Sequence, residues 1–214
     1  GFEADALVAA ALRRENQLSG DARRILRSLK GDVNVSAEIS LTDGDLAVAA
    51  DDITVSAMEI LGRPAGTLTA AVLYGGNEFQ VPRLSWSEGI TDASVTVRED
   101  GYLEGAITVE EFDLIWAQLA YPELNLPSGQ LRLSARARGR DEELEGTGEA
   151  ELTNLVFDEG DQERPASLRL TAITLSPGRV ETSGVAQYGD LVAGVGGEYA
   201  YDTGTAVGGA PAAQ

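Results

Sequence analysis

Short runs in which apolar and polar residues alternate fill most of this chain, from Asp32 to Tyr201. In the first run, apolar side chains at the odd positions of Val33–Leu41 alternate with polar side chains between them. Successive side chains of a strand point to opposite faces of a sheet, so this period predicts half-buried β-strands. Further runs follow about every ten residues, at 45–50, 53–60, 67–74, 78–84, 93–98, 102–109, 130–138, 144–152, 167–175, 179–188 and 191–201.

Turn sequences separate neighbouring runs and supply the glycine or asparagine that tight hairpins need at positive φ. Four are explicit in the chain: TDGD at 42–45, YGGN at 74–77, EDG at 99–101 and SPG at 176–178. Consecutive hairpins place strands that are neighbours in sequence beside one another in the sheet. The sequence therefore predicts an all-β fold, a long antiparallel meander over residues 32–202.

Three segments depart from the alternation. Residues 1–31 are Ala-rich, contain no proline and have a Ser-Gly-Asp break at 19–21, so they predict a helical N-terminal segment. Residues 110–120 are too apolar and too long for a hairpin loop, and they predict one short internal helix. Residues 203–214 are rich in Gly, Ala and Pro and predict a disordered tail.

The composition excludes several classes of function. A formal net charge of −19 argues against nucleic acid as a partner, because phosphate binding depends on clustered Lys and Arg. The chain has no Cys and no His, which removes thiol nucleophiles, imidazole bases and the usual zinc ligands. We therefore expect no enzyme activity, no cofactor and no metal site.

Clustered carboxylates are the only catalytic material left. They are predicted to lie in turns, as Asp43/Asp45, Asp51/Asp52, Asp141/Glu142/Glu143 and Asp158/Glu159/Asp161. None of these runs supplies both the alternating oxygen ligands and the distant Glu of a calcium loop. We interpret them as solvated turn charge, and a hydrolase with two converging carboxylates stays open as an alternative.

Some strands are apolar on both faces. Five of the six residues in 68–73 are apolar, and in 168–175 the apolar alternation changes phase. Either a closed barrel or sandwich buries both faces, or an open curved sheet has a concave apolar trough that shelters acyl chains. For the open sheet, the groove candidates are Val33, Val35, Ile39, Leu68, Val72, Leu131, Leu133, Leu168 and Leu170.

The segment Phe112–Phe157 resembles the AsmA/TamB-like superfamily of bacterial envelope proteins. Its matching parts are, in order, a short apolar helix, a proline-containing approach to Ser128-Gly129, a strand of alternating Leu and Arg, Gly139, an acidic turn, and the stretch 144–152. Residues 166–190 look like a second repeat, with a strand, a Pro-Gly turn and a returning strand. Type II secretion protein N is similar to the same superfamily and suits the length of this chain.

The resemblance implies a periplasmic chain, usually anchored in the inner membrane, that forms a taco-like open sheet with a hydrophobic groove. It implies a non-catalytic envelope protein, either a groove module for phospholipid transport or a scaffold subunit of a secretion or envelope assembly. The expected partners are phospholipid acyl chains and other envelope or secretion-system proteins. The chain starts at Gly1 without Met, so we expect that a targeting segment or membrane anchor is missing from it.

Two further interpretations stay open. The helical N-terminal segment either covers the end of the sheet or lies at a membrane surface with its arginines toward anionic headgroups. The membrane-facing candidates are Arg13, Arg14, Arg23, Arg24 and Arg27. The alternative to an envelope groove is a β-sandwich surface or adhesion module that binds protein or glycan.

Overall fold

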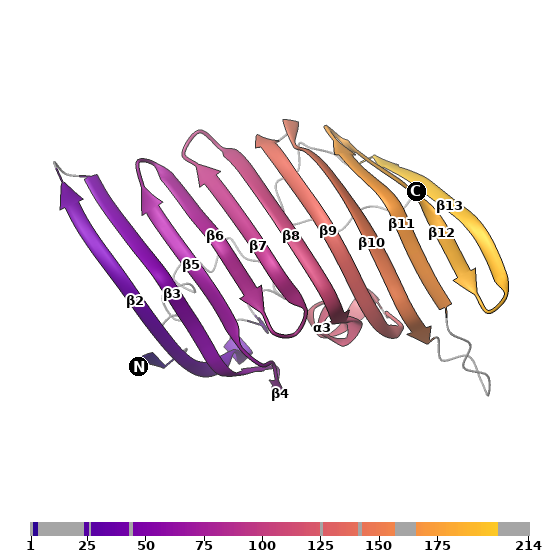
Figure 1. The fold of residues 1–214 in the computed structure, drawn as a ribbon, viewed down its shortest axis with the longest axis horizontal. Coiled ribbons are helices and arrows are strands. Elements are labelled where there is room, and N and C mark those ends of the chain that lie inside the picture. Colours follow the sequence, from indigo (N-terminus) through magenta and orange to yellow (C-terminus); the bar gives the residue numbers. More distant parts are fainter. Residues whose placement is uncertain are drawn as a thin grey trace.

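A computed structural model of the chain describes residues 2–3, 24–25, 27–42, 45–124, 126–140, 143–156 and 166–200. These residues form one 13-stranded sheet in the order β1-β2-β3-β5-β6-β7-β8-β9-β10-β11-β12-β13, with β4 paired to β3 (Figure 1). The strands are β1 (Phe2–Glu3), β2 (Lys30–Thr42), β3 (Asp45–Ile60), β4 (Arg63–Pro64), β5 (Leu68–Gly75), β6 (Glu78–Trp86), β7 (Ile90–Arg98), β8 (Tyr102–Asp113), β9 (Ser128–Arg140), β10 (Glu145–Val156), β11 (Ala166–Ser176), β12 (Arg179–Tyr188) and β13 (Leu191–Ala200). The helices are α3 (Leu114–Ala120) and the 3₁₀ turn η2 (Pro122–Leu124).

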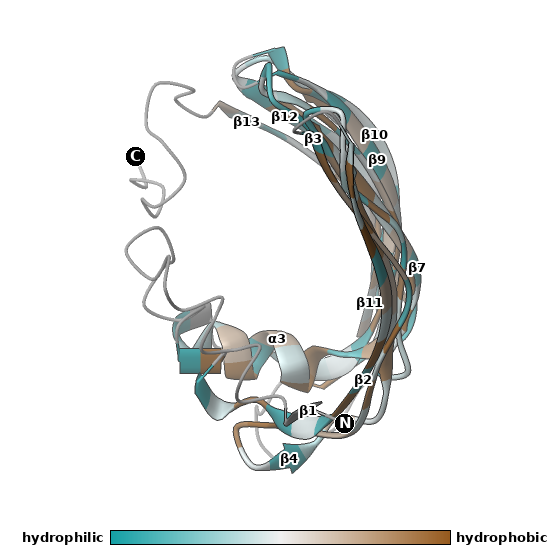
Figure 2. Cartoon of the chain, turned by 90° about the vertical axis from the view of Figure 1, so that its left-hand side faces the viewer, coloured by the Kyte–Doolittle hydropathy of each residue, from teal (hydrophilic) through white to brown (hydrophobic). Residues whose placement is uncertain are grey.

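The predicted fold class, an all-β antiparallel meander that forms a curved open sheet, is confirmed. Strands that follow one another in sequence pair with one another from β5 to β13, as consecutive hairpins require. Figure 2 shows the strands bent into an arc, with α3 on its concave side. Within the described residues β2 and β13 do not pair, so the sheet stays open rather than closing into a barrel.

The turn between β5 and β6 shows why the predicted hairpins form. Gly76 and Asn77 have φ of +58° and +65°, and positive φ at both central residues is the mark of a type I′ turn. This turn twists in the same sense as the strands that it joins, so β5 and β6 pair directly.

Three predicted boundaries are wrong. Phe2–Glu3, within the segment expected to be helical, forms β1 and pairs with β2, with Phe2 opposite Val33 and Glu3 opposite Asp32. Residues 110–113 extend β8 through a bulge, so the internal helix begins only at Leu114. The runs 45–50 and 53–60 form the single strand β3, in which a bulge rather than a turn interrupts the register.

Other predicted segments are described in part. Residues 24–25 and 27–28 are helical, in agreement with a helix near the end of the N-terminal segment. The rest of that expected helical segment and the expected disordered tail at 203–214 lie outside the described residues.

The core lies under α3 at one end of the strands. Trp116 of α3 packs in a cluster with Met58 and Ala65, and its ring meets the ring of Trp86 edge-on at 5.3 Å between centroids. The Trp86 indole also donates a hydrogen bond of 2.6 Å to the Ala65 carbonyl oxygen. Both tryptophans therefore anchor the core, as expected for aromatic rings with one polar atom.

Helix α3 is fixed at both ends. The Asp113 carboxylate caps its first turn by accepting a hydrogen bond of 2.9 Å from the Ile115 amide. At its last turn the Arg24 guanidinium donates to the Leu119 carbonyl oxygen at 2.7 Å. A carboxylate at the start of a helix and a cation at its end both interact favourably with the helix dipole. Each contact therefore stabilises α3.

Candidate apolar groove

One face of the sheet carries apolar side chains in rows that cross the strands. Residues directly opposite each other in an antiparallel pair share a face, so each row can be followed through the register. The middle row runs through Val35, Ile53, Ala70, Leu84, Ala93, Ile107, Ala135, Gly148, Ile173, Thr182 and Gly197. The lower row runs through Val33, Val55, Leu68, Trp86, Ile90, Val109, Leu133, Ala150, Leu170, Gly184 and Val195.

This apolar face is the concave one. Three members of the lower row, Val55, Leu68 and Trp86, pack against the cluster that contains Trp116 of α3. Since α3 lies inside the arc of the sheet (Figure 2), the rows face inward. Neither row contains an Asp, Glu, Lys or Arg, so the inner surface is uncharged along both.

The convex face carries charged side chains, some of which form cross-strand ion pairs. Arg169 of β11 donates to the carboxylate of Glu151 on β10 at 2.5 Å, and Arg179 of β12 reaches Glu198 of β13 at 2.9 Å. These pairs are solvent-exposed and each contributes little to stability, about 0–1 kcal/mol. Both partners of each pair lie on the convex face, so these charges are on the side of the sheet opposite the apolar rows.

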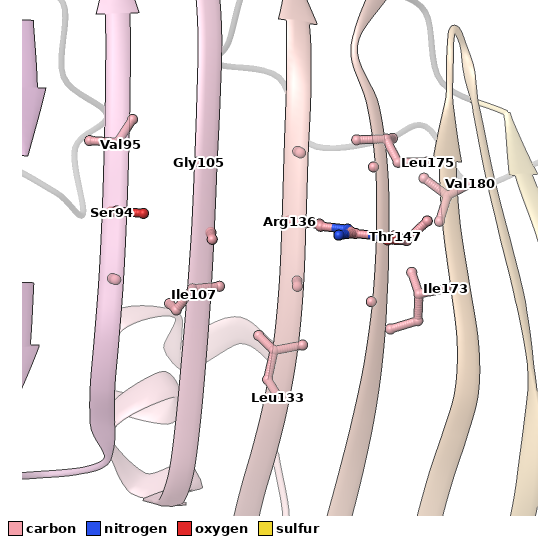
Figure 3. Close-up of a pocket in the computed structure, with 16 residues that line it drawn as sticks. Ser94, Val95, Gly105, Ile107, Leu133, Arg136, Thr147, Ile173, Leu175 and Val180 are labelled. Carbon is pink, nitrogen blue, oxygen red and sulfur yellow. The ribbon is translucent and has the colours of Figure 1, made fainter. Parts of the chain in front are cut away.

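A hollow of about 560 Å³ lies on the concave face over β7 to β12. Its floor is made by small residues that meet in the register, Gly105 opposite Ala137 and Ala137 opposite Gly146. Figure 3 shows larger apolar side chains around this floor, contributed by β7, β8, β9, β11 and β12. These are Val95, Ile107, Leu133, Ile173, Leu175 and Val180.

Among the described residues that line this hollow, Arg136 is the only charged one. The register pairs it with Ala106 and Thr147, one position away from the row of Ala135, so its side chain belongs to the convex face. There its Nε donates to the Thr147 hydroxyl at 3.3 Å, and the two side chains lie side by side in Figure 3. The surface of the hollow is therefore apolar.

A second hollow, of about 920 Å³, lies mainly over β11, β12 and β13, with Leu155 of β10 at its border. Leu168 and Leu170 line it from β11, and Tyr188, Leu191 and Val195 line it from the last hairpin. Because β11 and β12 contribute to both hollows, the two form a continuous apolar surface toward the C-terminal edge of the sheet.

All nine groove candidates from the sequence lie on the concave face. Leu68, Val33, Leu133 and Leu170 belong to the lower row and Val35 to the middle row. The other four share this face through their own register partners: Ile39 opposite Val48, Val72 opposite Ala50, and Leu131 opposite Leu152, which in turn lies opposite Leu168. Val33 is buried, whereas Ile39 is 69% exposed.

The sequence interpretation missed the residues that shape the first hollow. Val95, Ile107, Leu175 and Val180 were not among the candidates, although each stands at an apolar position of a predicted alternating strand. Following the alternation through every strand identifies Val95, Ile107 and Val180, whereas Leu175 reaches this face only because of a bulge in β11.

Strand β11 is not apolar on both faces. A bulge between Leu170 and Ala172 adds one residue, so the alternation changes phase within the strand. Ile173 and Leu175 therefore return to the concave face that Leu168 already occupies. In β5 the two-sided apolar pattern holds, because Leu73 pairs with Ala49 and Gln80 on the convex face.

The carboxylate clusters do not form a site among the described residues. Asp52, expected in a turn, lies inside β3 opposite Ser36, and its carboxylate accepts a hydrogen bond of 3.0 Å from the Thr54 hydroxyl. The described part of the chain holds no group of three acidic side chains placed to bind a metal ion. The predicted members Asp43, Asp141, Glu142, Asp158, Glu159 and Asp161 lie outside the described residues.

The arginine candidates are described in part. Arg13, Arg14 and Arg23 lie outside the described residues, whereas Arg24 and Arg27 are exposed. Arg24 uses its guanidinium to hold the last turn of α3, which is a structural contact within the chain.

In the part of the chain that is described, no helix combines the length and the apolarity that crossing a membrane requires. No family model matches the chain, and neither a curated protein nor a solved structure matches it.

Proposed function

We propose that this chain is a non-catalytic module of the bacterial envelope that holds phospholipid acyl chains against its concave face. The observation that carries the proposal is the pair of uncharged rows that crosses the sheet from β2 to β13. The resemblance of Phe112–Phe157 to the AsmA/TamB-like superfamily supports two further parts of the proposal: that the module lies in the periplasm, and that it takes part in phospholipid transport between membranes.

The energetics favour an apolar ligand. Soluble proteins rarely leave a large continuous apolar surface in contact with water, and such a surface marks a binding site. Each buried methylene contributes about 0.8 kcal/mol, so ten methylenes on this face contribute about 8 kcal/mol before the entropy of ordering the chain is subtracted. A headgroup would remain in water, because the concave rows offer it no charged partner.

The dimensions agree with the length of an acyl chain. Strands lie about 4.8 Å apart, so the rows from β2 to β13 extend for about 50 Å. Half of a bilayer's hydrocarbon core, the depth that one acyl chain fills, measures about 15 Å. The face therefore has room for more than one chain along its length.

The β-sandwich adhesion alternative has less support. A sandwich needs a second sheet to bury the inner face of the first. The described residues form a single sheet, and α3 covers only one end of its concave face.

Neighbouring residues of β9 provide the test, because strand alternation places them on opposite faces. Leu133 lies in the lower row and lines the first hollow, and Ser134 lies opposite Thr108 and Glu149 on the convex face. In a titration with cis-parinaric acid, Leu133→Asp should weaken binding about tenfold or more. Ser134→Asp, which adds the same charge, should leave it unchanged.

Circular dichroism and denaturant unfolding of both variants separate a lost site from a lost fold. Equal binding by the two folded variants, or no binding by the unaltered chain, would contradict the proposal.

A further inference from the structure

Strand β13 is an open edge of the sheet. It pairs with β12 along one side, and among the described residues no strand pairs with the backbone amide and carbonyl groups of its other side. Its side chains are exposed on both faces, Leu191 by 73% and Val192 by 66%. An edge strand of ten residues is a template for pairing with another chain.

The two edges of the sheet differ in protection. Natural edge strands avoid such pairing with charged side chains, proline or bulges. On β2 the charges are Lys30, Asp32 and Glu38, and β1 covers the strand at Asp32 and Val33. On β13 the only charge is Glu198, and the strand has no proline and no bulge in its pairing with β12. The unprotected edge is therefore β13.

The directions of the two edge strands limit the ways in which two copies of the chain can pair at β13. Every pairing from β2 to β13 is antiparallel, and their even number makes β2 and β13 run in the same direction. A copy added head to tail would pair β13 with β2 in parallel, which is slightly less stable and leaves an open filament. A two-fold axis normal to the sheet pairs β13 with itself in antiparallel fashion and closes the assembly.

We propose that β13 pairs with β13 of a second copy of this chain about a two-fold axis at Val195. This register uses almost the whole strand, since Val195 lies at its centre. It places Leu191 opposite Tyr199 of the partner subunit on the concave face, and Val192 opposite Glu198 of the partner subunit on the convex face. Apolar and aromatic cross-strand pairs of the first kind stabilise a sheet.

The dimer joins the concave faces of both copies. Opposite residues of an antiparallel pair share a face, so the apolar rows of one copy continue into those of the other. The inference holds whether or not the face carries lipid, because it depends on the backbone edge. The charge of −19 on each copy opposes association, so salt that screens this repulsion strengthens the dimer.

Two substitutions at Val192 test the register, since this residue is exposed and its replacement leaves the core intact. Val192→Glu places a carboxylate opposite Glu198 of the partner subunit twice per dimer, and it should raise the dimer dissociation constant about tenfold. Val192→Lys places an opposite charge there and should leave that constant unchanged or lower. Sedimentation equilibrium of the full chain at about 0.5 M salt measures both. Equal effects of the two substitutions would overturn the register.

A single cysteine provides a test that is independent of charge, because the chain has no cysteine of its own. In the proposed dimer Val195→Cys lies opposite itself, within the distance that a disulfide spans. The matched control is Val35→Cys on the other edge strand, where Val35 is 41% exposed on the same face. On oxidation Val195→Cys should form a covalent dimer and Val35→Cys should not. Equal cross-linking, or a chain that sediments as a monomer at every concentration, would overturn the proposal.

Discussion

Two regions of the concave side differ in what covers them: the covered end of the strands, which packs against α3, and the uncovered end of the sheet at β13. In the cluster under α3, Met58 is 4% exposed and Trp116 is 9% exposed. On β13, Leu191 is 73% exposed and Tyr199 is 49% exposed. Alternation therefore decides which face a side chain occupies, and a covering element decides whether it is buried. The covered end stabilises the fold, and the uncovered end leaves apolar surface for a ligand.

The largest expected effect comes from removing the covering aromatic ring. Trp116→Ala should lower the free energy of unfolding by about 3–5 kcal/mol, because it leaves a cavity between Met58, Ala65 and Trp86. Tyr199→Ala, at the uncovered end, should lower it by less than about 1 kcal/mol. Urea unfolding followed by circular dichroism measures both. Similar losses in the two variants would show that the covered end is no more stabilising than the open one.

A glycine in the middle of the sheet and a glycine on the open edge should respond to substitution in opposite directions. A Cβ on Gly148 of β10 would lie 2.9 Å from the Ser134 carbonyl oxygen, so Gly148→Ala should destabilise the fold by about 1–3 kcal/mol. A Cβ on Gly194 of β13 would meet no heavy atom within 4 Å, and neither glycine has a positive φ. Gly194→Ala should therefore stabilise the fold by about 0.4–1 kcal/mol. Thermal unfolding of both variants gives the signs, and the same sign at both positions would contradict the packing described for β10.

Substitutions at Asp113, the residue that caps α3, test how much this cap contributes to the stability of the fold. Asp113→Ala removes the carboxylate that accepts the Ile115 amide, and it should cost about 1 kcal/mol of stability. Asp113→Asn keeps an acceptor oxygen and should recover most of the loss. Unfolding monitored by tryptophan fluorescence is suitable, since Trp116 belongs to this helix and its ring contacts that of Trp86. An unchanged stability in Asp113→Ala would mean that the cap does not help to position α3.

The smallest effect concerns Asp100 in the turn between β7 and β8. The backbone amide of Tyr102 donates to its carboxylate at 3.1 Å, and Arg140 pairs with it, so the pKa of Asp100 lies below its ordinary value of 3.8. Because the pKa is lower in the folded state, ionised Asp100 stabilises the fold at pH values above 3.8. This stabilisation is lost as the pH falls through the folded-state pKa. An NMR titration of the Asp100 carboxyl should give a midpoint below 3.8, and Arg140→Gln should raise it. A midpoint at or above 3.8 would contradict the described contacts.

Much of the fold follows from the sequence because hairpins and alternation are local. The YGGN turn requires positive φ at Gly76 and Asn77, and period two then fixes which side chains share a face. This is why all nine groove candidates lie on the concave face.

The remainder depends on contacts that a local pattern does not contain. The bulge after Leu170 changes the phase of the apolar alternation in β11. Another bulge, in β3, lets the strand continue past Asp52 where a turn was expected. The pairing of Phe2 with Val33 joins residues far apart in sequence. The floor of the first hollow, where Gly105, Ala137 and Gly146 meet, depends on the register of three strands. Small residues are weak signals until that register is known.

Native mass spectrometry of the chain, extracted gently from bacterial cells, tests the central claim most directly. If the concave face holds acyl chains, the spectrum should show the protein with added phospholipid masses, and Leu133→Asp should show fewer of these adducts than Ser134→Asp. A spectrum that contains only the unliganded mass, for a chain that remains folded, would contradict the account.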